Sequence, residues 1–222
     1  FSWAPAWSVM IPLALVWILV LFVIGRGLSK GVEAANKVFL PLLVILFLAL
    51  VVRALFLPGA VEGLNAFFTP NWAALADPKV WLAAFAQIFY SLSVGFGIML
   101  TYASYLQRKS NLTGTALVAG FANSSFEILA GIGVFSAVGF MAHQGGVSVS
   151  EVEGLTGPIL SFVTFPKIIS MMPGGPIFGV LFFSSLVLAG VTSLLSLLQV
   201  VSGGLQDKFG WSPARSALVL GV

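Results

Sequence analysis

Long runs of apolar residues without charges constrain this chain more than any other feature. A helix needs about 20 residues to cross the hydrocarbon core of a bilayer. Only 8% of the residues are charged and 59% are hydrophobic, whereas a soluble domain averages about 25% charged residues. We therefore predict a single all-α, polytopic transmembrane helix bundle over 1–222. The predicted spans cover 7–25, 38–56, 80–106, 113–141, 176–205 and, truncated, 215–222.

The basic residues gather in alternate connections between these spans. Seven of the ten Lys and Arg residues lie in or beside the loops 26–37, 107–112 and 206–214. Cytoplasmic loops carry an excess of Lys and Arg, so we predict that these loops are cytoplasmic in a multi-pass protein of the plasma or inner membrane. The connections 57–79 and 143–175 then face outward, and the apolar run 159–172, too short to span, is expected to form a helix across the outer mouth. The seven residues are Arg26, Lys30, Lys37, Arg108, Lys109, Lys208 and Arg215.

The chain carries no group of side chains typical of an enzyme or a metal protein. It has no cysteine, which excludes disulfides and thiolate metal sites, and its one histidine, His143, cannot make a metal site of the usual kind. No nucleophile–base pair, phosphate-binding loop or basic nucleic-acid surface is visible. We therefore expect no enzymatic activity, no organic cofactor and no nucleic-acid partner. Because the chain starts at Phe1 and stops inside an apolar run, we expect a fragment of a longer protein.

Two glycines and two serines interrupt the predicted span 80–106. Gly95 and Gly97 follow Ser91 and Ser93, and each glycine costs about 1 kcal/mol relative to alanine in a helix interior. A break frees backbone N–H and C=O groups, which are tolerated at membrane depth where they line a polar cavity. Freed carbonyls suit a cation, and the positive end of a half-helix suits a carboxylate. The alternative is that the glycines only allow close helix packing.

An amide and a carboxyl side chain occur at membrane depth in the predicted span 113–141. Asn123 and Glu127 are four residues apart and therefore lie on one face of a helix. An ionisable residue inside a membrane is a functional candidate, because its charge must find a partner or a proton. The alternative is a protonated glutamic acid that holds two helices together.

Three residues near the middle of the predicted span 176–205 offer neutral oxygen atoms. Ala189, Thr192 and Ser193 lie within about one helical turn. The two hydroxyl groups and the Ala189 carbonyl are oxygens that a hard monovalent cation accepts. Against this stands the tendency of Ser and Thr in membrane helices to bond back to a preceding carbonyl.

Several segments of this chain resemble the neurotransmitter:sodium symporters. QIFYSLSVGFG at 87–97, followed by TYASY at 101–105, resembles their broken sixth helix, AGVTS at 189–193 their eighth helix, and RGLSKG at 26–31 the loop between helices four and five. The resemblance covers nearly the whole chain and implies an inverted-repeat transporter fold with a discontinuous helix, here from helix four to the start of helix nine. It also implies that N-terminal helices of the same protein are missing, among them helices one and three, which supply much of both sodium sites in that family.

The resemblance implies roles for individual residues. It assigns a first sodium ion to Ser91 and Asn123, and a second to Ala189, Thr192 and Ser193. It assigns the substrate pocket to Tyr90, Ser93, Phe96, Ser193 and Leu197, with Tyr90 near the outer gate. Gln87, Ser91, Asn123 and Glu127 would surround the position where chloride-dependent members hold their anion, and Glu127 would supply the charge or couple a proton. Two residues depart from the family pattern: Tyr90 replaces the usual phenylalanine and Ser91 the more frequent threonine.

The function implied by the resemblance is sodium-coupled symport of a small, hydrophobic amino acid, independent of chloride. Sodium ions are the expected inorganic partners, beside the amino acid and the lipid bilayer. One alternative is a transporter of the same fold for another small zwitterion or amine. The other is a membrane scaffold that keeps the fold but does not transport. Cooperative binding of sodium and substrate distinguishes a symporter from a scaffold, because linkage between two sites is reciprocal.

Overall fold

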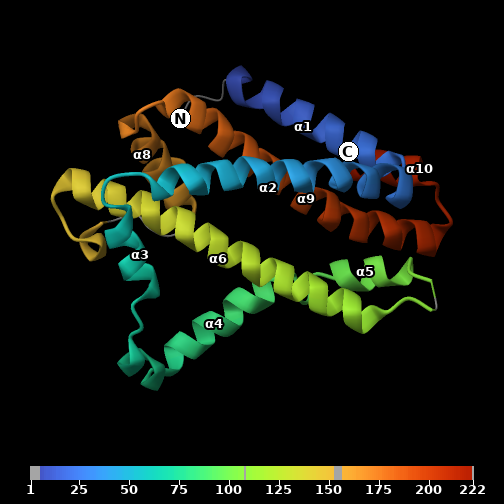
Figure 1. The fold of residues 1–222 in the computed structure, drawn as a ribbon. Coiled ribbons are helices and arrows are strands. Elements are labelled where there is room, and N and C mark those ends of the chain that lie inside the picture. The colour runs from blue at the N-terminus through green and yellow to red at the C-terminus, as the bar shows by residue number, and fades with distance from the viewer. Residues whose placement is uncertain (1–5, 108, 153–156, 222) are drawn as a thin grey trace. The chain divides into compact units, whose positions relative to one another are not determined.

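The computed structural model describes residues 6–107, 109–152 and 157–221, and the regular elements in these ranges are all helical (Figure 1). The prediction of an all-α chain is therefore confirmed. Arg108 and Val222, which the predicted loop 107–112 and the last predicted span include, lie outside the described residues. The α-helices are α1 (Trp7–Gly25), α2 (Ala34–Leu55), α3 (Ala60–Phe68), α4 (Pro78–Ser91), α5 (Ile98–Ser104), α6 (Leu112–Gly145), α7 (Gly157–Ile159), α8 (Phe165–Met171), α9 (Gly175–Phe209) and α10 (Pro213–Leu220).

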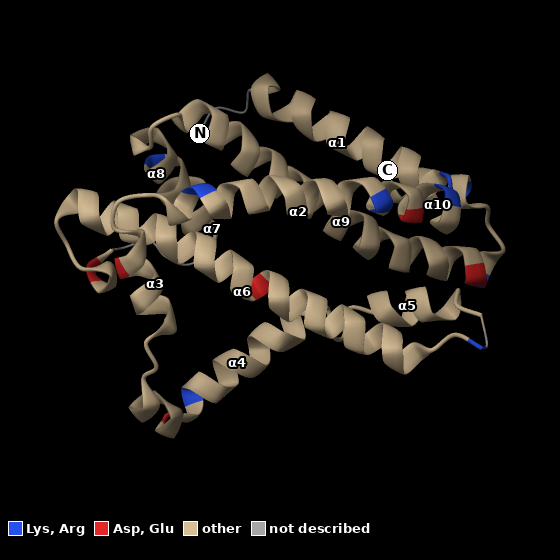
Figure 2. Ribbon diagram, viewed as in Figure 1, with Lys and Arg blue, Asp and Glu red and all other residues tan. Residues whose placement is uncertain are grey.

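Four helical segments in the described ranges are long and apolar enough to cross a bilayer: Trp7–Gly25, Leu28–Leu55, Leu112–Gly145 and Gly175–Phe209. The segment Leu28–Leu55 joins α2 to a preceding π-helical turn, Leu28–Glu33. Charged residues lie mainly near helix ends and in connections, with long uncharged stretches of ribbon between them (Figure 2). Large apolar side chains point outward from these helices, for example Ile45 (63% exposed) and Val180 (68%). Apolar surface on this scale requires lipid around it, so the chain is a membrane protein.

The predicted discontinuous helix is present. α4 has 14 residues and α5 has 7, so each is shorter than the roughly 20 residues that a span requires. Leu92 to Gly97 separates them without regular structure. The apolar run predicted at 159–172 forms a short helical segment, Gly157–Met171, made of α7, a π-helical turn and α8.

The chain divides into two compact units. Unit 1 contains Phe1–Leu43, Ser93–Ser110 and Leu186–Val222, and unit 2 contains Val44–Leu92 and Asn111–Ser185. The division passes through α2, through α9 and through the break between α4 and α5. Each unit is described by itself below.

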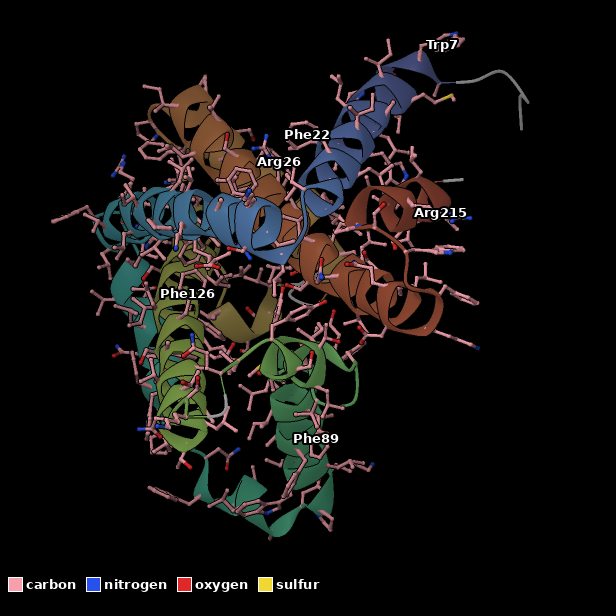
Figure 3. The ribbon with its side chains drawn as sticks, turned by 90° about the vertical axis from the view of Figure 1, so that its right-hand side faces the viewer. Trp7, Phe22, Arg26, Phe89, Phe126 and Arg215 are labelled. Atoms are coloured by element: carbon pink, nitrogen blue, oxygen red, sulfur yellow. The ribbon has the colours of Figure 1, made fainter. Side chains whose placement is uncertain are left out.

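In unit 1, the end of α1 packs against α10 and the middle of α9. Val20 and Ile24 are fully buried in a cluster with Leu195 of α9 and Ala217 of α10. Basic side chains here rest on aromatic rings, since the Arg26 guanidinium lies 5.5 Å from the Phe22 ring centre and that of Arg215 lies 4.6 Å from the Trp211 ring centre. Figure 3 shows Phe22, Arg26 and Arg215 in this unit. Such cation–π contacts keep the charge near water while the ring is covered.

In unit 2, α3 packs closely on the second half of α6 through glycines. A Cβ atom added to Gly63 would collide with the Phe135 carbonyl oxygen, and one added to Gly139 with that of Gly59. Small residues allow helix backbones to approach this closely in membranes. His143 Nδ1 at the end of α6 lies 3.5 Å from the Glu62 carboxylate of α3, and both side chains are exposed.

Candidate functional site

The break between α4 and α5 depends on left-handed backbone conformations. Ser93, Gly95 and Gly97 have φ angles of 54°, 88° and 76°, a region that L-residues other than glycine rarely adopt. A Cβ atom on Gly95 would meet no atom within 4 Å, so close packing does not explain this glycine. At Gly97 a Cβ atom would lie 3.3 Å from Val200 Cγ1 of α9, so conformation and packing both favour glycine there. The break leaves backbone groups of both half-helices without their usual helical partners.

The first cluster of polar side chains lies in unit 2, where α4 ends beside α6. The Asn123 amide nitrogen donates to Ser91 Oγ at 3.2 Å and to Glu127 Oε1 at 3.0 Å. All three side chains are half-buried. Both N–H groups of the Asn123 amide are thereby used. The oxygen atoms of Asn123 (Oδ1), Ser91 (Oγ) and Glu127 are therefore the groups of this cluster that could bind a cation. We call Ser91, Asn123 and Glu127 the carboxylate cluster.

Glu127 is the only Asp, Glu, Lys or Arg within α6. In the part of the chain that the structure describes, no basic side chain forms an ion pair with it. Gln87, the fourth residue predicted around the anion position, lies one turn before Ser91 in α4, and its side chain is exposed. Within the described residues it makes no hydrogen bond to the carboxylate cluster. The structure therefore brings together three of the four residues predicted around the anion position.

The second cluster lies in unit 1, within α9. Thr192 Oγ1 donates to the Ala189 carbonyl at 3.0 Å, which is the back-bond that Ser and Thr commonly form in membrane helices. This bond also holds two neutral oxygens side by side on the helix surface. Ser193 is exposed, and its hydroxyl makes no hydrogen bond within the described ranges. We call Ala189, Thr192 and Ser193 the hydroxyl cluster.

A hydrogen bond from α5 to α9 was not anticipated from the sequence. The Tyr102 hydroxyl donates to Ser196 Oγ at 3.0 Å, and these residues are 94 positions apart. Ser196 Oγ donates in turn to the Thr192 carbonyl at 3.2 Å. The only signal in the sequence is that a tyrosine and a serine inside apolar helices each need a partner for their hydroxyl group.

The residues predicted to line a substrate pocket fall into both units. Ser93, Phe96, Ser193 and Leu197 belong to unit 1, whereas Tyr90 belongs to unit 2. Phe96 and Leu197 are 47% and 42% exposed, so both present apolar surface outside the core of unit 1. Tyr90 is 73% exposed at the end of α4. Within unit 1, Phe96 and Leu197 supply aromatic and aliphatic surface, and Ser93 and Ser193 supply hydroxyl groups.

The family model that describes the sodium:neurotransmitter symporter family matches residues 4–222. The chain belongs to this family. An uncharacterized sodium-dependent transporter of Methanocaldococcus jannaschii is 39% identical over 218 residues, which are 97% of this chain and 44% of the relative. The sodium- and chloride-dependent creatine transporter 1 of Bos taurus is 35% identical over 190 residues, 84% of this chain and 29% of that protein. These relatives are transporters rather than enzymes.

A solved structure of a related protein supports the same fold. The crystal structure of MhsT in complex with L-phenylalanine superposes with a TM-score of 0.76 at 40% sequence identity. The match covers 94% of this chain and 45% of MhsT. The chain thus spans less than half the length of these relatives. The predicted membership of the symporter family and the predicted transporter fold are confirmed.

Proposed function

We propose that the full-length protein is a sodium-coupled symporter that imports a small, hydrophobic amino acid. The observation that carries this proposal is the pair of oxygen clusters next to a broken helix: Asn123 bonded to Ser91 and Glu127, and Thr192 bonded to Ala189. A discontinuous helix at membrane depth provides backbone groups that bind ions and substrate carboxylates. The sodium gradient then drives accumulation, because sodium and substrate bind the same state of the protein.

Sodium is proposed to bind at both clusters. The first ion takes oxygens of Ser91 and Asn123, with the Glu127 carboxylate close enough to lower the cost of a buried positive charge. The second ion takes the Ala189 carbonyl and the hydroxyls of Thr192 and Ser193. Carbonyl, hydroxyl and carboxylate oxygens are the ligands that hard cations prefer.

The substrate is proposed to be an amino acid with an apolar side chain. MhsT, 40% identical to this chain, was solved with L-phenylalanine. Phe96 and Leu197 of unit 1 provide exposed apolar surface, and Leu197 lies one helical turn after Ser193. A charged side chain would be poorly solvated against such surface. A second candidate is another small zwitterion, because creatine transporters are among the relatives.

Transport is proposed to be independent of chloride. The Glu127 carboxylate occupies the carboxylate cluster as a fixed negative charge, so no anion has to be recruited from solution. The creatine transporters, by their names, depend on chloride. We also propose that the basic residues at 26–37, 109 and 206–215 face the cytoplasm, following the distribution of Lys and Arg.

Binding of amino acids to the purified full-length protein tests this proposal. We expect leucine, phenylalanine and similar amino acids to bind in sodium and to bind far more weakly when potassium replaces sodium at equal ionic strength. Lysine, glutamate and creatine serve as chemically matched comparisons. Binding that is equal in sodium and potassium would contradict sodium coupling, and preference for creatine would favour the second candidate.

A further inference from the structure

Two hydrogen bonds in series lead from α5 to the α9 turn that carries the hydroxyl cluster. Tyr102 donates to Ser196 Oγ at 3.0 Å, and Ser196 donates to the Thr192 backbone carbonyl at 3.2 Å. The Thr192 side chain makes a separate bond, from Oγ1 to the Ala189 carbonyl at 3.0 Å. All four residues belong to unit 1. Hydrogen bonds in series strengthen one another, so the Tyr102–Ser196 bond is linked to the backbone of Thr192, whose hydroxyl is proposed to bind the second sodium ion.

The contact between α5 and α9 does not depend on the Tyr102 hydroxyl alone. A Cβ atom on Gly97 would lie 3.3 Å from Val200 Cγ1, and one on Gly203 would lie 3.5 Å from Thr101 Cγ2. The neighbouring face of α9 is anchored by Leu195, which is fully buried in the core of unit 1. Removing the hydroxyl thus leaves the packing of the half-helix in place. What disappears is the polar link to Ser196.

The Tyr102 side chain also borders open space. It lines a cavity of about 630 Å³ in unit 1, together with Tyr105, Val32, Asn36, Leu40 and Pro41. The Tyr102 ring therefore borders open space beside the contact between α5 and α9.

We infer that Tyr102 is a positioning residue that couples the α5 half-helix to the second sodium ion through Ser196. This inference rests on the proposed function, because it takes the hydroxyl cluster as a sodium site. A sodium ion bound at Thr192 and Ala189 would hold this turn of α9 in one geometry. Because Ser196 is bonded to the same turn, that geometry favours the Tyr102–Ser196 hydrogen bond, which in turn holds α5 against α9. By reciprocity, an α5 held in place raises the affinity of the turn for sodium.

The test uses the full-length protein and its Tyr102→Phe variant. The sodium concentration for half-maximal amino-acid binding should rise about two- to tenfold, as expected for one net hydrogen bond. Amino-acid affinity at saturating sodium should stay unchanged. Hydrogen exchange gives the second readout: sodium should protect the amides of Ile98–Ser104 in the wild type and protect them less in Tyr102→Phe. A residue that acts only in packing would not change this sodium-dependent protection.

Tyr105→Phe is the matched control, because Tyr105 follows Tyr102 by one turn and its hydroxyl makes no hydrogen bond in the described ranges. It should behave like the wild type. Ser196→Ala removes the same link from the other side and should reproduce the Tyr102→Phe shift, whereas Ser196→Thr, which keeps the hydroxyl, should not. In Tyr102→Phe/Ser196→Ala the effects should be less than additive, since both changes remove one interaction.

The outcomes separate this inference from the function on which it rests. Loss of sodium dependence in the wild type itself would overturn the proposed function. A sodium-dependent wild type whose sodium requirement is unchanged in both Tyr102→Phe and Ser196→Ala would overturn the role of Tyr102 alone. An equal shift in Tyr105→Phe would overturn it as well. If Tyr102→Phe does not fold, Ser196→Ala and Ser196→Thr decide the question.

Discussion

The carboxylate cluster and the hydroxyl cluster are both proposed to bind a sodium ion, but they are built from different groups. In the first, Asn123 of α6 joins Ser91 of α4 and the Glu127 carboxyl group, so two helices and one ionisable side chain take part. In the second, Thr192 bonds to Ala189 within a single turn of α9, and every oxygen is neutral. Under the proposed function, a full charge would stabilise the sodium ion at the first cluster, and several dipoles held in an accurate geometry would stabilise it at the second.

The two clusters should therefore respond differently to mutation. A carboxylate acts over distance and tolerates small shifts, because Coulomb energy falls only with the inverse of separation. Carbonyl and hydroxyl dipoles act only at contact distance. Loss of charge should be most damaging at the first cluster, whereas loss of a positioning contact such as Tyr102–Ser196 should matter at the second.

The largest effect is expected from Asn123→Ala. This change removes the donor that bridges Ser91 and Glu127 and leaves the carboxylate without its partner. A hydrogen bond to a charged group contributes roughly 1.5–3 kcal/mol, so the sodium concentration for half-maximal amino-acid binding should rise about ten- to a hundredfold. Ser125→Ala, two positions further along α6, is the control and should have no effect. A shift below twofold in Asn123→Ala would show that the carboxylate cluster does not bind sodium.

A smaller effect is expected from Thr192→Ala combined with Ser193→Ala. The double variant keeps the helix and the Ala189 carbonyl but removes both hydroxyl oxygens. Each neutral contact contributes about 1 kcal/mol, so losing both should raise the sodium requirement about thirtyfold at most. Ser185→Ala is the matched control, since Ser185 of the same helix donates only to the Phe182 carbonyl. Unchanged sodium dependence in the double variant would remove the hydroxyl cluster from the cation site.

Leu197→Ala should change substrate preference rather than sodium affinity. Leu197, 42% exposed, lies one turn after Ser193 and borders the hydroxyl cluster. A missing methylene in an apolar pocket costs about 1–3 kcal/mol, and because this side chain is partly exposed we expect about a three- to tenfold loss for small apolar amino acids. Bulkier ones should gain relative to them in competition binding. An unaltered rank order of amino acids would exclude Leu197 from the pocket.

The smallest effect is expected at Glu151, a carboxylate that lies outside both clusters. The Ser148 backbone N–H donates to its carboxylate at 2.9 Å and lowers the pKa of Glu151 below its ordinary value. Because folding lowers this pKa, the ionised carboxylate stabilises the short turn Val149–Glu151 at pH values above the ordinary pKa of a glutamate. This stabilisation is lost as the pH falls through the lowered pKa of Glu151. The protection factor for hydrogen exchange at this turn, which corrects for the intrinsic pH dependence of amide exchange, should be constant near neutral pH and fall only in acid. Glu151→Gln should remove that pH dependence, and a pH dependence that persisted would contradict the assignment.

The fold was predictable because its signals are local. Uncharged runs predicted helices where α1, α2, α6 and α9 lie, and Gly95 with Gly97 predicted the break between α4 and α5. α3 was not predicted, since Pro58 and Pro70 mark the region as irregular. Its position depends on tertiary contact, where Gly63 meets the α6 backbone near Phe135.

The candidate sites were predictable only in part. Asn123 and Glu127 share a helix face by spacing alone, and the resemblance to the symporters added Ser91 from another helix. The spacing within one helix did not indicate that Tyr102 bonds to Ser196, because 94 residues separate them. The resemblance to the symporters also grouped Gln87 with these residues, and its side chain is exposed in the structure.

Uptake by Glu127→Ser in chloride-free and chloride-containing buffer tests the central difference between the clusters most directly. The wild type should transport equally well in gluconate and in chloride, because Glu127 carries the negative charge itself. Glu127→Ser removes that charge but leaves Ser91 and Asn123, so it should be inactive in gluconate and regain sodium-driven uptake when chloride is added. Full uptake by the variant without chloride, or chloride dependence of the wild type, would contradict the account.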